Sequence, residues 1–200
     1  MELTPKDRKR IEESIRGKYT KVARNPENLF KYPTGRLGLE IFEYERQIIQ
    51  AIPDAVTTSY CGVGNPFTLG PIVDGEAVLD IGCGTGVDTI VAANKVGSTG
   101  KVTGIDLVPK MLVQARANVQ MMDLKNVKFL EASAEKLPFP DSNFDVVISN
   151  GVFNLVIDKP KALAEAFRVL RPGGRLMIAD QILVGQLPRE KKARIKNWFR

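Results

Sequence analysis

The chain has 200 residues, of which 44% are hydrophobic, and its formal net charge is +6 at pH 7. This composition predicts a globular core, and no apolar run approaches the roughly 18 residues that a membrane-spanning helix needs. The start of the chain lacks the apolar segment of a signal peptide, and two cysteines cannot form a secreted disulfide framework. We therefore expect a cytoplasmic protein that does not associate with membranes.

The positive charge is concentrated at the two ends of the chain. Residues 1–24 carry eight basic and four acidic side chains, and residues 186–200 carry six and one, which leaves the remainder slightly acidic. A nucleic-acid enzyme usually carries its basic residues beside the active cleft. We interpret these charges as the solvated faces of terminal helices, with binding to RNA or to anionic lipid as the alternative.

The first 70 residues have the patterns of helices. Thr4 and Pro5 predict the start of a helix, and its buried face is expected to carry Ile11, Ile15, Tyr19 and Val22. After turns near residues 25–28 and 32–35, apolar residues at helical spacing from Leu37 to Ile52 predict a second helix that ends at Pro53. We expect residues 1–70 to form a helical cap or lid over a cleft, with simple packing against a sheet as the alternative.

Residues 71–200 alternate strands with helices, which predicts an α/β domain with a parallel sheet covered on both faces. The predicted strands are residues 76–81, 101–105, 127–130, 144–149 and 175–183, and the predicted helices are about 87–95, 109–122 and 160–170. Pro172-Gly173-Gly174 is expected to end the last of these helices. Ligands of such sheets bind at the carboxyl ends of the strands, where the strand order reverses.

The most informative segment is Val78–Gly86, an apolar strand that runs into three alternating glycines. Glycines let a ligand approach the backbone, and the helix that follows offers free N–H groups. Asp106, at the end of the second strand, can accept both hydroxyls of a ribose. Val87 stands where a dinucleotide motif requires glycine, and no phosphate loop with its lysine is present. A purely structural glycine turn is the alternative.

The spacing Asp80-x-Gly82-x-Gly84-x-Gly86 resembles the first motif of the class I methyltransferases, which use S-adenosylmethionine. The resemblance implies a Rossmann-like sheet, S-adenosylmethionine as cofactor and S-adenosylhomocysteine as product. It also implies that Asp80 orients the methionine part of the cofactor, or else bonds the loop. The expected cofactor contacts are Asp80, Gly82, Cys83, Gly84, Gly86, Asp106, Leu107, Met111, Ser133, Ala134, Glu135 and Asn150. For Cys83 and Met111 the alternative is a place in the core, and for Asn150 the alternative is that it only ends its strand.

Two further stretches, residues 62–66 (Gly-Val-Gly-Asn-Pro) and 149–155 (Ser-Asn-Gly-Val-Phe-Asn-Leu), resemble the arsenite methyltransferases, and the likeness covers roughly residues 60–185. In that family two cysteines at these places hold trivalent arsenic, and here the positions are Val63 and Gly151. A soft metalloid requires soft thiolates, and Cys61 lies two residues upstream of the family position. We therefore expect a different acceptor: a free thiol, a metalloid already bound to small thiols, or an activated carbon.

The chain contains no histidine, so the commonest proton acceptor near neutral pH is absent. We expect direct in-line methyl transfer to a nucleophile that is already ionised or has a free lone pair, catalysed mainly by positioning, which can contribute about 7–11 kcal/mol in favourable cases. The candidate catalytic residues are Asn150, Tyr60 and Cys61, and if a base is needed Glu135, Asp180 or Tyr60 must supply it. No metal site is expected. A cofactor-binding module without activity and a quinone-type C-methyltransferase are the alternative functions.

The resembling families close their sheet with two more, antiparallel, strands after the fifth, and these are not visible here. The last residues instead predict an amphipathic helix with Ile195, Trp198 and Phe199. An uncovered fifth strand would leave an open sheet edge. We expect either a homodimer or a longer parent chain, a small-molecule acceptor as partner, and no nucleic acid.

Overall fold

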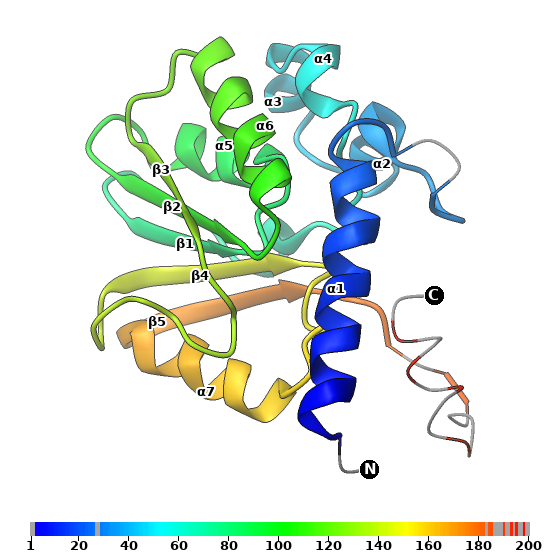
Figure 1. The fold of residues 1–200 in the computed structure, drawn as a ribbon. Coiled ribbons are helices and arrows are strands. Elements are labelled where there is room, and N and C mark those ends of the chain that lie inside the picture. The colour runs from blue at the N-terminus through cyan, green and yellow to red at the C-terminus, as the bar shows by residue number, and fades with distance from the viewer. Residues whose placement is uncertain are drawn as a thin grey trace.

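The computed structural model describes residues 3–26, 29–182, 184, 185, 190, 193, 195 and 198. Its centre is a parallel sheet of β1 (Ala77–Ile81), β2 (Lys101–Asp106), β3 (Val127–Glu131), β4 (Phe144–Asn150) and β5 (Leu170–Ala179), in the order β3-β2-β1-β4-β5 (Figure 1). The order reverses between β1 and β4. This sheet confirms the predicted Rossmann-like α/β fold.

Helices cover both faces of the sheet because the side chains of each strand alternate in direction. Val78 of β1 packs with Ala92 of α5 (Val87–Lys95), whereas the next residue, Leu79, packs with Ala162 and Ala166 of α7 (Lys159–Val169). On the α5 side of the sheet, α6 (Pro109–Met121) completes the layer (Figure 1). The predicted helices of this region are confirmed to within one or two residues.

The fifth strand differs from its prediction of residues 175–183, because it spans Leu170–Ala179. Phe144 of β4 pairs with Leu170, but Val146 pairs with Arg175, so the segment between Leu170 and Arg175 is absorbed as an irregularity of the ladder. Gly173 adopts φ = +79° there. The Pro-Gly-Gly segment is therefore a bulge inside β5 and not a turn before it. Leu183 lies outside the described residues.

The N-terminal helix α1 (Pro5–Val22) has the predicted start. Thr4 accepts a hydrogen bond from the backbone N–H of Asp7 at 3.2 Å, and the Asp7 carboxylate accepts one from the Thr4 N–H at 3.0 Å. This reciprocal pair is a capping box. Of the buried face that was predicted, Ile11, Ile15 and Val22 are buried, and Tyr19 is half-buried.

The prediction of a second N-terminal helix, from Leu37 to Ile52, is wrong. In its place are α2 (Gly35–Ile41), α3 (Arg46–Ala51) and α4 (Asp54–Thr57), followed by the 3-10 turn η1 (Pro66–Leu69). The chain reverses at Glu43, whose φ is +56°, and Leu37 and Ile41 are more than half exposed. The apolar residues between Leu37 and Ile52 therefore do not lie on one continuous helix face, because the turn at Glu43 directs Tyr44 into the core.

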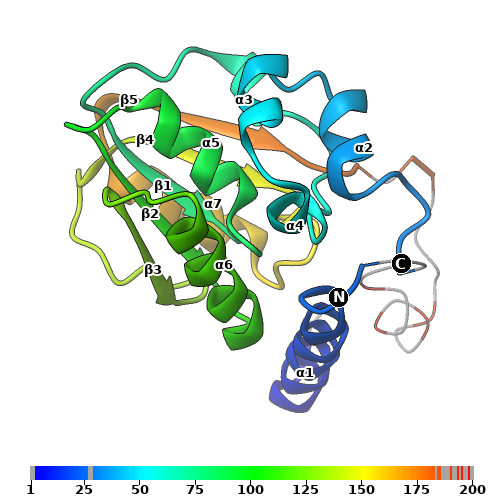
Figure 2. The same ribbon diagram turned by 90° about the horizontal axis from the view of Figure 1, so that it is seen from above.

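Helix α1 packs against α6 and stands at the carboxyl edge of the sheet, toward which the strand arrowheads point (Figures 1 and 2). The division of the chain at residue 70 stays a prediction. Most of the predicted C-terminal helix lies outside the described residues. Within the described part, no helix is long and apolar enough to cross a membrane.

Candidate functional site

A cavity lies at the carboxyl ends of β1, β2 and β4, the place where the strand order reverses. Its walls come from α1, the segment at Cys61, the glycine loop after β1, the segments that follow β2 and β3, and the segment between β4 and α7. Of the predicted site residues, those that line it are Cys61, Gly82, Gly84, Asp106, Leu107, Met111, Ser133, Ala134, Glu135 and Asn150. Sequence motifs that are far apart thus meet in one space.

The glycine loop supplies the floor of this cavity. Gly82 and Gly84 adopt φ values of +74° and +52°, in the left-handed region that favours glycine. A Cβ on Gly82 would collide with Val152, whereas one on Gly84 would meet nothing within 4 Å. Gly82 therefore permits close packing, and Gly84 leaves open space where a ligand can approach the backbone. Gly86 lies behind the loop, where a Cβ would be 3.2 Å from Ala115 of α6.

Asp106 ties the glycine loop to the end of β2. Its two carboxylate oxygens accept hydrogen bonds from the backbone N–H groups of Gly84 at 2.9 Å and Val108 at 2.8 Å. Burial raises the pKa of Asp106 to about 6, although these N–H groups favour the charged form. The cavity therefore contains a desolvated carboxylate beside the loop, and polar hydrogens of a ligand can compensate its charge there.

Asp80 and Cys83 lie behind the loop and are not among the residues that line the cavity. Asp80 is 2% exposed and accepts a 2.6 Å hydrogen bond from the Thr89 hydroxyl of α5, and burial raises its pKa. Cys83 belongs to the core cluster that includes Phe129, so of its two predicted places the thiol takes the core. Both residues brace the loop from behind. Direct contact of either with a cofactor stays a prediction.

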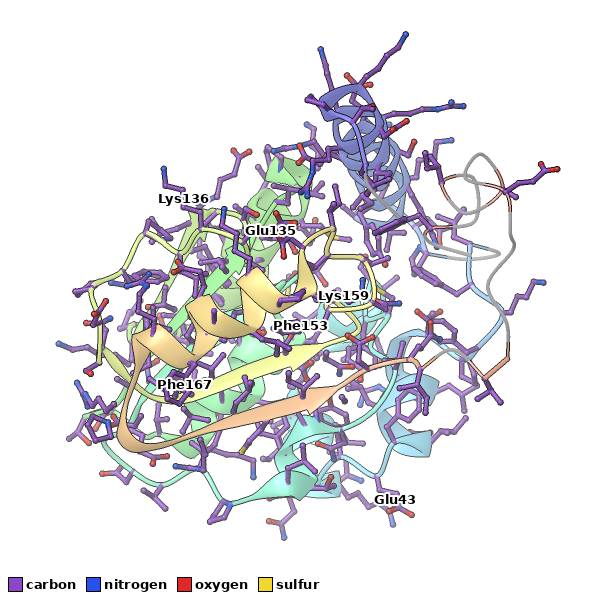
Figure 3. The ribbon with its side chains drawn as sticks, turned by 90° about the horizontal axis from the view of Figure 1, so that it is seen from below. Glu43, Glu135, Lys136, Phe153, Lys159 and Phe167 are labelled. Carbon is purple, nitrogen blue, oxygen red and sulfur yellow. The ribbon has the colours of Figure 1, made fainter. Side chains whose placement is uncertain are left out.

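Two other acidic groups are occupied by backbone hydrogen bonds. Glu135 accepts hydrogen bonds from the N–H groups of Ile157 at 3.1 Å and Asp158 at 3.0 Å, just before α7 begins at Lys159 (Figure 3). Asp180 accepts one from the Asn154 N–H at 3.0 Å. Both carboxylates hold the segment between β4 and α7 in place, a structural role that makes them weaker candidates for a general base.

Helix α1 supplies one wall of the cavity, although its individual lining residues were not singled out from the sequence. Glu12, Ile15 and Tyr19 line the cavity, and Arg16 forms an ion pair with Glu131 of β3 at 3.1 Å. The sequence predicted the apolar face of α1 and left open whether it covers a cleft or packs against the sheet. Residues 155–157 of the β4–α7 segment, which also line the cavity, were missed as well, whereas Val152 lies where the strand-end rule predicts it.

Asn150 lies at the carboxyl end of β4 and joins the cavity to the segment at residues 62–66. Its side-chain oxygen accepts a hydrogen bond from the Val63 N–H at 2.8 Å, and its nitrogen donates to the Gly64 carbonyl at 2.8 Å. Tyr60 donates to that same carbonyl at 3.1 Å and is not among the cavity-lining residues. Burial raises the pKa of Tyr60 well above its usual range, which argues against its role as a base.

Val63 and Gly151 face each other beside this asparagine. A Cβ on Gly151 would lie 3.4 Å from both Val63 methyl groups, so the contact is apolar. Cys61 lines the cavity nearby, and burial raises the pKa of its thiol to about 12, which leaves it protonated at neutral pH. Among the described residues, no group of three or more His, Cys, Asp and Glu side chains is placed to hold a metal ion.

The parallel sheet of this chain, with a glycine loop after β1 and an acid at the end of β2, matches the fold of the class I S-adenosylmethionine-dependent methyltransferases. The chain belongs to the methyltransferase domain family, whose model matches residues 72–200. This membership indicates S-adenosylmethionine as the cofactor, and it confirms the resemblance predicted from the glycine motif.

Similar proteins of known activity fall into two groups. An arsenite methyltransferase of Halobacterium salinarum is 38% identical over 151 residues, which are 76% of this chain and 38% of that protein. A ubiquinone/menaquinone biosynthesis C-methyltransferase of Psychromonas ingrahamii is 44% identical over 108 residues, which are 53% of this chain and 43% of that protein. The chain thus spans less than half the length of either relative.

Solved structures agree with this family. An arsenic(III) S-adenosylmethionine methyltransferase from Chlamydomonas reinhardtii is 34% identical with a TM-score of 0.56, covering 74% of this chain and 50% of that one. A methyltransferase from Aquifex aeolicus is 30% identical with a TM-score of 0.55, covering 63% of this chain and 70% of that one.

Proposed function

We propose that this chain transfers a methyl group from S-adenosylmethionine to a small-molecule acceptor. The observation that carries the proposal is the joint presence, in one cavity, of the open backbone at Gly84 and the desolvated carboxylate of Asp106. Asp106 would accept the ribose hydroxyls, Leu107 and Ser133 would flank the adenine, and Gly82 and Gly84 would contact the methionine part. Asp80, Cys83 and Gly86 would act from behind by shaping the loop.

Positioning is the main catalytic contribution that this site can make. The cofactor supplies an electrophilic methyl group, and the protein needs only to hold the nucleophile in line with it in a space that excludes water. The wall of Ile15, Tyr19 and Leu155 supplies such an apolar cover. Since Glu135 and Asp180 are occupied by backbone N–H groups, we propose an acceptor that needs no strong base. Residues 1–70 would serve as the cap of the cavity, because α1 forms one of its walls.

Among acceptors, we propose a thiol or an activated carbon in preference to free arsenite. Val63 and Gly151 form an apolar contact, and the thiol of Cys61 is held protonated, so the described residues supply no pair of thiolates to a soft metalloid. Of these two acceptors, the activated carbon would be that of a quinone precursor. It is favoured by the 44% identity to a C-methyltransferase of quinone biosynthesis and by the apolar walls of the cavity.

The experiment has two stages. Calorimetry with S-adenosylmethionine tests for the cofactor site, and we expect a single saturable site in the wild type. Incubation of the loaded protein with small thiols, thiol-bound arsenic and quinone precursors, with mass spectrometry of the products, then tests for methyl transfer. Absence of cofactor binding would overturn the proposal, whereas binding without any methylated product would favour the module without activity.

A further inference from the structure

We propose that Asp88, Tyr44 and Tyr60 are positioning residues that hold the Asn150 side chain in one orientation on the cavity wall. The inference rests on the proposed function, because it assigns these residues to cofactor and acceptor placement. None of the three lines the cavity itself. They come from three separate segments, the turn before α3, the stretch after α4 and the first turn of α5, and they meet Asn150 from behind. We name these four residues the Asn150 cluster.

The hydrogen bonds of Asn150 permit only one orientation of its amide. The side-chain nitrogen donates to the Gly64 carbonyl at 2.8 Å and to the Asp88 carboxylate at 3.0 Å. The side-chain oxygen accepts from the Val63 N–H at 2.8 Å. A flipped amide would place its oxygen against a carboxylate and a carbonyl, and its nitrogen against an N–H group. All of these contacts would be repulsive.

The two tyrosine hydroxyls complete the cluster around Asp88 and the Gly64 carbonyl. Tyr44 donates to the Asp88 carboxylate at 2.6 Å, and Tyr60 lies within hydrogen-bond distance of the Tyr44 oxygen at 3.1 Å. Each hydroxyl has one proton, so donation to Asp88 leaves the Tyr44 oxygen free to accept. The Asp88 carboxylate thus accepts the Tyr44 proton and one hydrogen of the Asn150 amide. The single Tyr60 proton can go either to the Tyr44 oxygen or to the Gly64 carbonyl.

The polar groups of the cluster are buried, and burial costs free energy unless each group has a hydrogen-bond partner. Tyr44, Tyr60 and Asp88 are 5%, 4% and 8% exposed. Burial raises the pKa of Asp88 to about 6, while its bonds from Tyr44 and Asn150 oppose the rise. The other titratable groups whose charge interacts with Asp88 are Asp80 and Cys61. No cation neutralises Asp88 among the described residues, so its bonds from the cluster are its main compensation.

The cluster also explains the backbone at residues 62–64. A Cβ on Gly62 would collide with the Asn150 amide and the Tyr60 hydroxyl, so only glycine lets this loop approach the end of β4. The loop in turn places Val63 against Gly151 on the cavity side. The Asn150 cluster thus fixes where residues 62–64 lie against the cavity wall, because the Asn150 amide bonds the Val63 N–H and the Gly64 carbonyl.

A double-mutant experiment separates positioning from simple stabilisation. Tyr44→Phe and Asp88→Asn are each made in the wild type and in an Asn150→Ala background, and S-adenosylmethionine affinity and thermal unfolding are measured for each. Tyr32→Phe is the matched control, because it removes a partly buried tyrosine hydroxyl that donates to the Cys61 carbonyl and does not touch Asn150. In the wild type we expect Tyr44→Phe and Asp88→Asn each to weaken cofactor binding by about tenfold, the loss of one charge-assisted hydrogen bond.

If the effect acts through Asn150, the same two substitutions change affinity by less than about twofold in the Asn150→Ala background, although they still lower thermal stability. Equal losses of affinity in both backgrounds, or no loss in the wild type, would overturn the proposal. Failure of the wild type to bind S-adenosylmethionine would instead remove the proposed function and the inference together. If Asp88→Asn does not fold, the Tyr44→Phe arm decides alone.

Discussion

The two sides of the cavity are built in different ways. On the Asp106 side, the carboxylate accepts hydrogen bonds from the backbone N–H groups of Gly84, in the glycine loop, and Val108, two residues further along the chain. The glycines of the loop leave its backbone open to a ligand. On the Asn150 side, the bonds join residues as distant in sequence as Tyr44 and Asn150, and most are between side chains. On our proposal, the first side binds the ribose of the cofactor, and the second side places the wall near which the acceptor would bind.

The largest effect is expected for Asp106→Ala, which removes the carboxylate on one side of the cavity. We expect cofactor binding to fall below detection, more than about 100-fold, because a buried ribose contact and the latch on the glycine loop are lost together. Calorimetry measures the affinity, and circular dichroism checks that the fold is intact. Asp123→Ala, an exposed acid after α6, is the control. Unchanged affinity would remove the assignment of the ribose site.

The acceptor side can be tested by restoring thiols. We expect the wild type to bind arsenite weakly, and the double variant Val63→Cys with Gly151→Cys to bind it at least about tenfold more tightly, because soft thiolates are then adjacent. The Cβ added at residue 151 would lie 4.0 Å from the Cβ of residue 63, which also suits a disulfide, so the measurement needs a reducing agent. Tight arsenite binding by the wild type would contradict the proposed apolar wall.

Acidity should move binding and stability in opposite directions. In the folded protein the pKa values of Asp88 and Asp106 are raised to about 6 from their usual value of 3.8. At a pH between these two values, the folded protein therefore binds more protons than the unfolded chain. These two groups therefore make the unliganded fold more stable as pH falls from 7 to 5. Cofactor affinity should fall by about tenfold at pH 5 for each of the two carboxylates whose charge the binding requires, because roughly a tenth of each remains ionised there.

Two measurements check this prediction, thermal unfolding of the free protein and calorimetry with S-adenosylmethionine across this pH range. The Asp106→Asn variant should lose part of the pH dependence of binding. Glu165, whose pKa is lowered to about 2 by its bonds with Arg168, stays ionised throughout and does not mask the effect. Cofactor affinity that is constant from pH 7 to 5 would show that neither aspartate contributes through its charge.

The smallest effect is expected at the ion pairs that join α1 to the sheet. Arg16 and Glu131 are both more than one third exposed, so we expect Arg16→Ala to lower the free energy of unfolding by less than about 1 kcal/mol. Chemical denaturation measures this change. Ile11→Ala, which removes a side chain that is 1% exposed, should cost about 2–5 kcal/mol and is the comparison. A larger loss from Arg16→Ala would mean that charge, not packing, attaches the helix.

Much of the fold could be predicted from local patterns. The strand and helix alternation after residue 76 holds because each element there has one dominant signal, such as the buried run of β1 or the Asp158 cap of α7. The N-terminal region was harder. Its apolar spacing suggested one helix, but the left-handed residue Glu43 breaks it, and a non-glycine residue at positive φ has no strong sequence signal. The bulge in β5 was hidden for a similar reason, since Pro-Gly-Gly is as typical of a turn as of a bulge.

What the sequence by itself determined is the Asp106 side of the cavity: the glycine spacing and Asp106 are read from neighbouring residues, because backbone conformation and strand ends are local properties. Only the tertiary structure decided that Cys83 turns to the core, that α1 closes the cavity, and that Asn150 is held by Asp88 and Tyr44. The physical reason is that these outcomes depend on which distant side chains share a buried space. Desolvation and hydrogen-bond direction are fixed only when the chain is packed.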